Sequence, residues 1–405
     1  MFNIKLNPLW SKTVLVITFS FLLLLSSYVL IDPKGSAKNL LSIYSFFAIN
    51  FESLFLYIGF GVLVFLVVIA FSKSGSRKIV LEGRSNYSYF SWYSMLFATG
   101  MGAALLYWST YEWLVYYTNP IEGQEQSLLN ARSYPLFHWM FTGWALYILP
   151  TVAFVFSLMK NPNTPLTFSG ILLKEQSGPI RILLDIFFIG AILTGAGVGL
   201  ALSFPLMSAA VSKLFGLNQT IYLDFVMLLI CMCIVSISVY RGLQNGIKKL
   251  SNFNIILVIS FLTLILITGP TKYIVINTFE PVTYVLKNYL SLSLLKSQYS
   301  LDWTVFYWAW YIALAPAVGA FIVNISNNKT VRELIFGALI VGSLGCIFHI
   351  GVLSNISIYA YENGILDAPK IYADQSMTSH ALVIETISSL DLSLIHISEP
   401  TRRAI

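Results

Sequence analysis

The chain has 405 residues, of which 57% are hydrophobic and 10% are charged. Because soluble domains carry about 25% charged residues, this composition excludes a soluble protein and indicates one embedded in the lipid bilayer. The net charge of +6 comes from lysines and arginines in connecting loops, so it bears on membrane orientation and predicts no nucleic-acid partner. Cys231, Cys233 and Cys346 lack metal-ligand spacing, and the chain carries no cofactor motif, so we expect no metal, no cofactor and no enzyme activity.

Apolar runs near the length of about 20 residues that crosses a bilayer predict an all-α membrane protein. Nine runs are strong, and a weaker tenth begins near Thr378. The first has no signal cleavage site and is expected to remain as a helix. The nine strong runs are Lys12–Ile31, Tyr44–Phe71, Tyr89–Tyr117, Tyr134–Met159, Ile182–Ala210, Ile221–Tyr240, Phe253–Thr268, Thr304–Ile325 and Leu334–Ile358.

Basic residues in alternate loops predict the orientation, because basic loops stay on the cytoplasmic side. With the N-terminus inside, the inner loops carry 14 such residues and the outer loops 8. We therefore expect a multi-pass protein of the plasma (inner) membrane with a cytoplasmic N-terminus. The inner residues are Lys5, Lys12, Lys73, Arg77, Lys78, Arg84, Lys160, Lys174, Arg181, Arg241, Lys248, Lys249, Lys329 and Arg332, and the outer ones are Lys34, Lys38, Arg132, Lys213, Lys272, Lys287, Lys296 and Lys370.

Two spans contain runs of small residues, Gly100–Ala104 in the third and Ala313–Gly319 in the eighth. Such runs permit either local unwinding or close contact between helices. Interruptions at corresponding positions of two halves mark the substrate site in many transporters. We therefore predict a secondary transporter with an inverted repeat and broken third and eighth helices, and tight packing is the alternative.

The fourth span carries Trp139, Trp144 and Tyr147. At about 100° per residue, these side chains fall at about 0°, 140° and 80°, so a continuous helix places them on one side. Aromatic faces attract a cation without a counter-charge, which predicts a pocket for an ammonium group. Core packing is the alternative interpretation.

Four blocks between Tyr89 and Gly364 resemble the betaine/choline/carnitine transporter family, whose members carry trimethylammonium compounds. FYWAW at 306–310 is the most specific part. The resemblance implies an inverted five-helix repeat preceded by two extra helices, and it is also the basis for expecting a homotrimer. The blocks are SWYSMLFATGMGAALLYWSTYEW (Ser91–Trp113), HWMFTGWALY (His138–Tyr147), GLQNGIKKLSNFN (Gly242–Asn254) and DWTVFYWAWYIALAPAVGAFIVNISNNKTVRELIFG (Asp302–Gly337).

The resemblance further implies a central aromatic box. One wall would come from the fourth span and the opposing ring from Tyr311, at a position where the family usually has Trp. The floor would offer free backbone N–H groups to a substrate carboxylate. The implied substrate-binding residues are Trp139, Trp144, Tyr147, Tyr311, Trp310, Trp308, Met101, Gly100 and Gly102.

Two departures from the family pattern bear on substrate and ion. Ala104 stands where choline carriers usually have an acidic residue, which favours zwitterions such as glycine betaine or carnitine. Thr194 is the hydroxyl that remains in ILTGAGVG, a segment that is hydroxyl-rich in sodium-dependent members, and it is the candidate ion ligand. The coupling ion is left open between sodium and proton, with substrate exchange as a further possibility.

Among the ionisable residues in or near the predicted spans, three are considered for a functional role. Glu112 is expected to be a solvated carboxylate at a helix end. His138 is interpreted as a packed or hydrogen-bonded side chain, with a proton relay as the alternative, and His349 needs a buried partner.

The predicted organisation has five parts. They are residues 1–88 with two helices, 89–270 with the first repeat, 271–303 with an interfacial helix over Tyr284–Leu294, 304–392 with an incomplete second repeat, and 393–405. The last part resembles neither the family nor a span, so we expect a non-native tail on a C-terminally truncated member that does not transport. Two functions remain for the intact protein: a carrier importing or exchanging glycine betaine, carnitine or choline, or a non-transporting substrate or osmotic sensor of the same fold.

Overall fold

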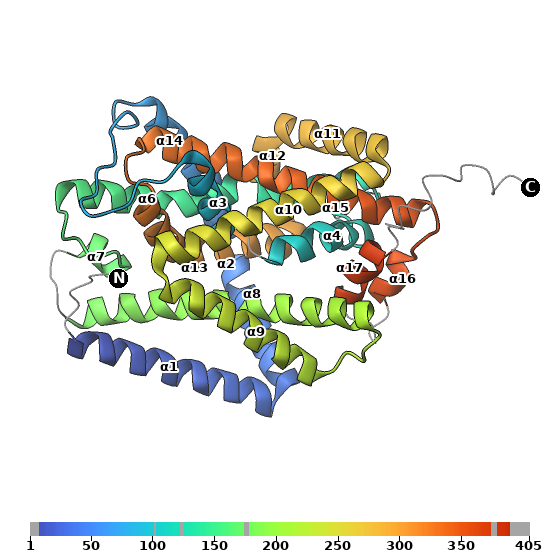
Figure 1. Ribbon diagram of the computed structural model, residues 1–405, viewed down its shortest axis with the longest axis horizontal. Coiled ribbons are helices and arrows are strands. Elements are labelled where there is room, and N and C mark those ends of the chain that lie inside the picture. The colour runs from blue at the N-terminus through green and yellow to red at the C-terminus, as the bar shows by residue number, and fades with distance from the viewer. Residues whose placement is uncertain (1–7, 101–102, 122–124, 174–177, 374–378, 389–405) are drawn as a thin grey trace, which may run out of the picture.

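The computed structural model describes residues 8–100, 103–121, 125–173, 178–373 and 379–388. These residues form helices joined by loops, with one isolated bridge between Lys78 and Thr330. The elements, shown in Figure 1, are α1 (Pro8–Ile31), α2 (Pro33–Phe71), α3 (Tyr89–Gly100), α4 (Ala103–Thr118), α5 (Leu128–Trp139), α6 (Phe141–Lys160), α7 (Phe168–Leu172), α8 (Pro179–Phe215), α9 (Ile221–Tyr240), α10 (Lys248–Thr268), α11 (Thr271–Lys287), α12 (Tyr289–Ser293), α13 (Val305–Ile325), α14 (Val331–Phe336), α15 (Ser343–Glu362), α16 (Ala368–Ala373) and α17 (Ser379–Ser388), with π-helical turns η1 (Leu243–Ile247), η2 (Ser300–Thr304) and η3 (Gly337–Gly342).

Eight segments of the described chain are long and apolar enough to cross a membrane, which confirms an all-α membrane protein. They correspond to the predicted spans one, two and four to nine. The predicted third span falls on α3 and α4, and its central residues 101–102, where the break was expected, lie outside the described residues. The segments are Lys12–Ile31, Pro33–Phe71, Leu128–Lys160, Pro179–Phe215, Ile221–Tyr240, Leu243–Thr268, Ser300–Ile325 and Val331–Glu362.

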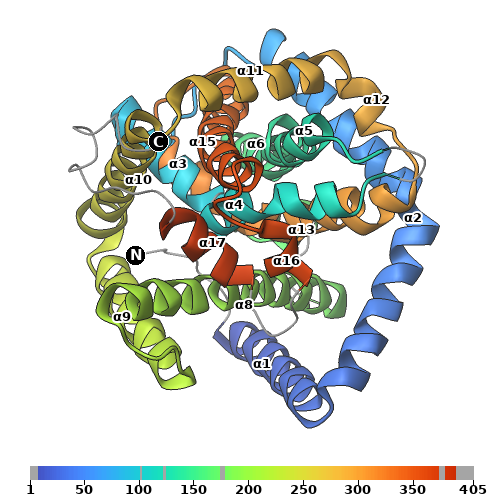
Figure 2. The ribbon, with the colours of Figure 1, turned by 90° about the vertical axis from the view of Figure 1, so that its right-hand side faces the viewer.

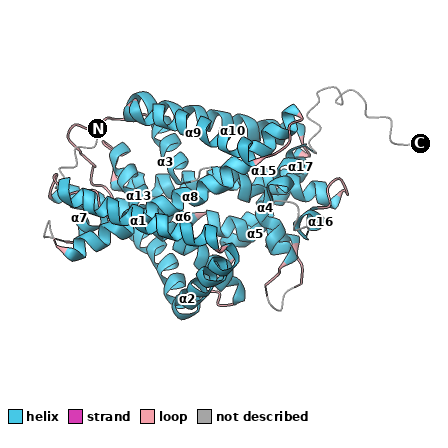
Figure 3. Cartoon of the chain, turned by 90° about the horizontal axis from the view of Figure 1, so that it is seen from below, coloured by secondary structure: helices cyan, strands magenta, loops and turns pink. Residues whose placement is uncertain are grey.

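The packed centre of the molecule contains α3, α4, α5, α6, α13 and α15, as the end-on view in Figure 2 shows. Its fully buried side chains include Trp92, Trp144, Trp308 and Tyr307. In contrast, α1, α8 and α9 expose many large apolar side chains, which is the pattern of helices that face hydrocarbon. Figure 3 shows the same helices from a third direction.

The predicted fourth helix is interrupted at Met140, so the prediction of one continuous helix over 134–159 is wrong. Met140 has φ −87° and ψ −138°, and it ends α5 and precedes α6. A helical ψ is near −42°, so this residue rotates α6 relative to α5. No glycine or proline marks the interruption in the sequence. As a result, angles counted from Trp139 through Met140 no longer describe which side chains share a face.

The predicted break at Ala313–Gly319 is also wrong, because α13 runs unbroken through this segment with Pro316 inside it. The small residues serve close contact with α6 instead. A Cβ added at Gly319 would lie 2.9 Å from the backbone nitrogen of Thr151, and one at Gly143 would lie 2.8 Å from Cζ of Tyr311. Tight packing, the alternative interpretation of this run, is therefore correct for the eighth span.

The interfacial helix predicted over Tyr284–Leu294 covers only the last turn of α11 and the short helix α12, and the main helix between the seventh and eighth spans is α11, which begins at Thr271. A buried polar group joins it to the bundle. The guanidinium of Arg132, on α5, donates from Nη2 to the Tyr273 hydroxyl (2.5 Å) and from Nε to Asn355 Oδ1 on α15 (3.0 Å). One side chain thus holds three helices together.

The α2–α3 loop and the α13–α14 loop are joined by a network that we call the interloop clasp. The Ile79 amide donates to the Lys329 carbonyl (2.7 Å), and the Leu81 amide donates to Asn327 Oδ1 (2.8 Å). The Asn327 side-chain amide donates in turn to the Arg84 carbonyl (3.0 Å). The clasp therefore connects segments about 250 residues apart in the sequence.

Candidate functional site

A cavity of about 430 Å³ lies between α3, α4, α5, α6, α8 and α13. Its lining is mainly small and aliphatic apart from four aromatic side chains, and the described lining residues include no carboxylate, amine or imidazole. The lining residues are Ala98, Thr99, Gly100, Ala104, Trp139, Tyr147, Ile192, Gly195, Ala196, Gly199, Leu200, Ser203, Trp310, Tyr311, Leu314 and Val318.

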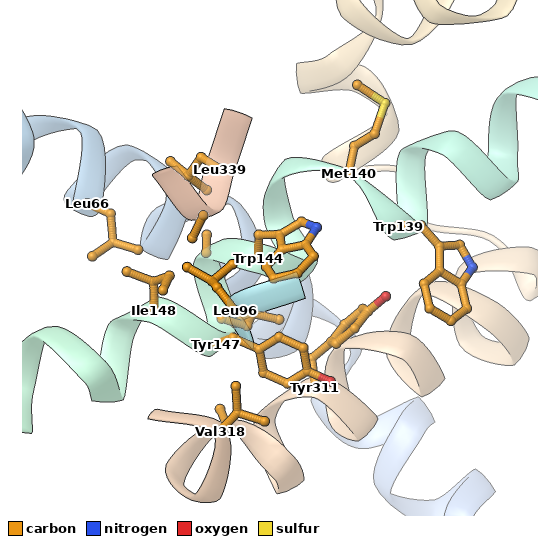
Figure 4. Packing of buried hydrophobic residues seen from close by; sticks show 14 of the residues in the cluster. Leu66, Leu96, Trp139, Met140, Trp144, Tyr147, Ile148, Tyr311, Val318 and Leu339 are labelled. Atoms are coloured by element: carbon orange, nitrogen blue, oxygen red, sulfur yellow. The ribbon is translucent and has the colours of Figure 1, made fainter. Parts of the chain in front are cut away.

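Rings from three helices, α5, α6 and α13, meet at this cavity. The Tyr147 and Tyr311 rings are 5.2 Å apart between centroids and stand at 89° to each other. The Trp139 and Tyr311 rings are 6.3 Å apart at 90°. Figure 4 shows Tyr147 beside Tyr311, and Met140 between Trp139 and the remainder of α6. Rings at right angles present faces in two directions, a geometry that suits a rounded cation better than a flat stack does.

Trp144 does not line the cavity. It is fully buried and stacks on Phe97, with centroids 5.9 Å apart and 25° between the planes. Its indole also lies against backbone, since a Cβ at Gly342 would be 2.3 Å from the ring and one at Gly100 would be 2.9 Å from it. Trp144 thus forms a second layer behind Tyr147, with 6.3 Å between the two ring centroids. Trp139 and Trp144 are about 140° apart even in a continuous helix, and the interruption at Met140 changes this angle further.

Trp308 and Trp310 point to different surroundings as well. Trp310 lines the cavity, whereas Trp308 is buried against α2, where a Cβ at Gly59 would lie 2.7 Å from its Nε1. Residues two apart in an α-helix are about 200° apart around its axis, so these two cannot both face one cavity. The helical period alone therefore predicts, from the sequence, that Trp308 and Trp310 face different sides of the helix.

The remaining predicted site residues are placed as follows. Gly100 lines the cavity, and Met101 and Gly102 lie outside the described residues. The Thr194 side chain is exposed, and its hydroxyl donates to the carbonyls of Gly190 (2.8 Å) and Ala191 (3.2 Å) in its own helix. Its neighbours Gly195 and Ala196 line the cavity while Thr194 itself does not.

Glu112 is a buried carboxylate beside the cavity, so the prediction of a solvated helix-end residue is wrong. It is inaccessible to solvent and accepts hydrogen bonds from Trp139 Nε1 (2.8 Å) and from the Tyr116 hydroxyl (2.5 Å). These two bonds fix the indole that lines the cavity. The four-residue spacing of Glu112 and Tyr116 on one helix was an available signal for this pairing.

His138 is a packed, hydrogen-bonded histidine, as predicted. Its Nδ1 lies 3.0 Å from the Tyr116 hydroxyl, and its Nε2 lies 3.1 Å from Thr304 Oγ1. The ring stacks on Tyr307 at 4.6 Å between centroids. This network extends the contacts of Glu112 across α4, α5 and the start of the eighth span.

The sequence comparison decides the family. Residues 13–398 match the profile described as betaine/carnitine/choline family transporter. The chain belongs to the betaine/carnitine/choline transporter family. This match includes the first helices and extends past the range Tyr89–Gly364 in which the blocks were recognised.

Several characterised proteins resemble this family member. A carnitine transporter of Acinetobacter baumannii is 29% identical over 329 residues, which are 78% of this chain and 60% of that protein. A glycine betaine/proline/choline/ectoine transporter of Vibrio parahaemolyticus is 31% identical over 379 residues, 89% and 66% of the two chains. A high-affinity choline transport protein of Escherichia coli is 29% identical over 318 residues, 75% and 46%. The family and these names describe membrane transporters and not enzymes, which confirms that prediction. The chain spans about half to two thirds of the length of these relatives.

Proposed function

We propose that the protein to which this chain belongs is a secondary transporter of a quaternary-ammonium solute, and that the aromatic cavity is its binding site. The observation that carries the proposal is the meeting of Trp139, Tyr147, Trp310 and Tyr311 at one cavity whose described lining has no ionised side chain. A trimethylammonium group has no hydrogen-bond donor, so aromatic faces are the means by which a protein can recognise it.

The neutral lining favours a zwitterion, glycine betaine or carnitine, over choline. Transferring an uncompensated cation into an apolar cavity is costly, and a zwitterion carries its own anion. The hydroxyl groups of Thr99 and Ser203 lie in the lining and donate within their own helices, to the carbonyls of Met95 (2.7 Å) and Gly199 (2.6 Å), so each would have to turn its proton toward the cavity to donate to a carboxylate. The small α8 residues Ala196 and Gly199 leave space opposite the rings, whereas Leu314 of α13 fills the space over Gly195.

The membrane location, the oligomeric state and the ion coupling of the transporter are proposed on grounds other than the cavity. The distribution of basic loops supports a plasma-membrane protein with a cytoplasmic N-terminus. The homotrimer rests on family resemblance. Coupling to sodium or to protons, or exchange without an ion, is distinguished by the experiment below, and Thr194 is the residue proposed to contact an ion.

The test combines binding with uptake. Binding of labelled glycine betaine, carnitine and choline to the purified 405-residue chain is measured by equilibrium dialysis, and uptake by the whole protein is measured in proteoliposomes with sodium, with potassium or with a proton gradient. Saturable binding together with accumulation supports a transporter. Binding without accumulation supports the sensor of the same fold. If none of the three solutes binds, the assignment of the aromatic cavity fails.

A further inference from the structure

A second cavity, which we call the lateral groove, lies between α3, α10 and α15 and has a volume of about 380 Å³. It shares no described lining residue with the aromatic cavity. Its volume lies within the range of small-molecule sites, about 300–1,000 Å³. The lining includes Phe90, Phe97, Val258, Leu344, Phe348 and His349.

The lateral groove opens toward the membrane. Of its lining residues, Phe90 is 50% exposed, Leu344 is 58% exposed and Ile259 is 48% exposed. Ile259 and Leu344 belong to segments long and apolar enough to cross a membrane, so their exposed side chains face hydrocarbon in a bilayer and the molecules that reach the groove come from the lipid phase.

One ring nitrogen of His349, which lines the groove, has no hydrogen-bond partner among the described residues. His349 is 92% buried, and its Nδ1 lies 2.7 Å from the carbonyl oxygen of Gly345. A carbonyl oxygen can only accept, so Nδ1 carries the proton, and in the neutral ring Nε2 is then an acceptor. No described residue donates to Nε2. A second ring proton would place a charge in apolar surroundings, which disfavours that state.

The His349 ring is held in place by stacking. Phe97 stacks on His349, with centroids 5.6 Å apart, and on Trp144 at 5.9 Å, and the ring planes are 25° apart in both pairs. The acceptor nitrogen is therefore fixed before any ligand arrives, which lowers the entropy lost on binding. The same stack connects the lateral groove to the layer behind Tyr147.

We propose that the lateral groove binds a neutral, lipid-soluble molecule that carries a hydroxyl group, such as a long-chain alcohol dissolved in the bilayer. The apolar walls contact its chain, and the hydroxyl donates a hydrogen bond to His349 Nε2. A plain hydrocarbon chain leaves His349 Nε2 unpaired, and a charged headgroup loses its hydration without gaining a counter-charge.

The test uses the 405-residue chain in lipid nanodiscs with a long-chain alcohol that bears a photoreactive diazirine. After illumination, labelled peptides are identified by mass spectrometry, and dodecanol competes against dodecyl methyl ether, which has a similar chain but no donor. We expect labels on α3, α10 and α15, and dodecanol should compete about fivefold better than the ether, the effect of one hydrogen bond worth about 1 kcal/mol. Equal competition by the two compounds overturns the proposal.

Three variants test whether the labelling and the preference for alcohol over ether arise in the lateral groove. His349→Phe keeps a flat ring on Phe97 but lacks the acceptor, so the preference for alcohol over ether should disappear while the thermal unfolding temperature stays within a few degrees. Val258→Trp fills the groove and should remove the label. Leu257→Trp is its matched control, because Leu257 is 51% exposed on the same helix and does not line the groove. Undiminished labelling of Val258→Trp, or a preserved alcohol preference in His349→Phe, refutes the site.

Discussion

Tyr311 contributes two separable groups to the aromatic cavity. Its ring stands at right angles to both Tyr147 and Trp139, and its hydroxyl donates to the His138 carbonyl over a long distance of 3.3 Å. If recognition rests on the ring, the hydroxyl is dispensable.

Substitution of Tyr311 tests this division. Tyr311→Leu should weaken binding of glycine betaine about five- to thirtyfold, because a desolvated cation–π contact is worth about 1–2 kcal/mol. Tyr311→Phe keeps the ring and should bind within about twofold of the original. Equilibrium dialysis with labelled solute measures both, and equal losses in the two variants would assign the effect to the hydroxyl.

Glu112 determines how firmly the cavity wall is held. Glu112→Leu leaves Trp139 Nε1 and the Tyr116 hydroxyl without their acceptor and should lower the free energy of unfolding by about 2–4 kcal/mol. Glu112→Gln keeps an acceptor oxygen and should lose less. Thermal unfolding in detergent compares the two, and a Leu variant as stable as the original would mean that the buried bonds contribute little.

At the scale of helices, the contact between α6 and α13 depends on glycine. The Gly319 backbone approaches Thr151 so closely that a methyl group cannot fit without movement. We expect Gly319→Ala to destabilise the protein by about 1–3 kcal/mol through overpacking.

A matched glycine separates overpacking from helix propensity. A Cβ at Gly61, on the exposed side of α2, meets no atom within 4 Å. Gly61→Ala should therefore be neutral or stabilising by up to about 1 kcal/mol, as alanine favours a helix. Thermal unfolding of both variants checks the pair, and similar shifts would remove the case for a steric contact at Gly319.

The existence of the helices could be predicted from sequence because hydropathy reports directly on the bilayer, and the predicted bounds of Ile221–Tyr240 coincide with α9. The interruption at Met140 could not be predicted, since it involves neither glycine nor proline. The run Ala313–Gly319 was ambiguous for a physical reason: small residues permit unwinding and close packing alike. The cavity wall was therefore predicted in part, with Trp139, Tyr147, Trp310 and Tyr311 meeting and Trp144 and Trp308 packed elsewhere.

At the scale of the whole molecule, the interloop clasp joins two loops through Asn327. Asn327→Ala removes the acceptor for Leu81 and the donor to Arg84, and should speed amide hydrogen exchange in the α2–α3 loop at least severalfold. Asn363→Ala is the matched control, because among the described residues the Asn363 side chain donates to the carbonyl of Tyr359 in the adjoining helix α15 and not to another loop. Exchange measured by mass spectrometry should change in the first variant alone, and unchanged exchange there would show the clasp to be redundant.

Orientation is the second property of the whole chain open to test. In a background without Cys231, Cys233 and Cys346, a membrane-impermeant maleimide added to intact cells should label Lys272→Cys and spare Lys249→Cys. Both lysines are exposed in the structure, so access depends on the side of the membrane. Labelling in the reverse pattern would place the N-terminus outside.

The glycine contacts along α6 and α13 also restrict how a solute can enter. Tyr147 is on one of these helices and Tyr311 on the other, and the backbones are too close to slide or separate without breaking the packing that holds them. We therefore expect the Tyr147 and Tyr311 rings to move together as one rigid unit. The facing wall on α8 contributes Ile192, Gly195, Ala196, Gly199 and Leu200, and it meets α13 through a side chain, because a Cβ at Gly195 would lie 2.2 Å from Leu314.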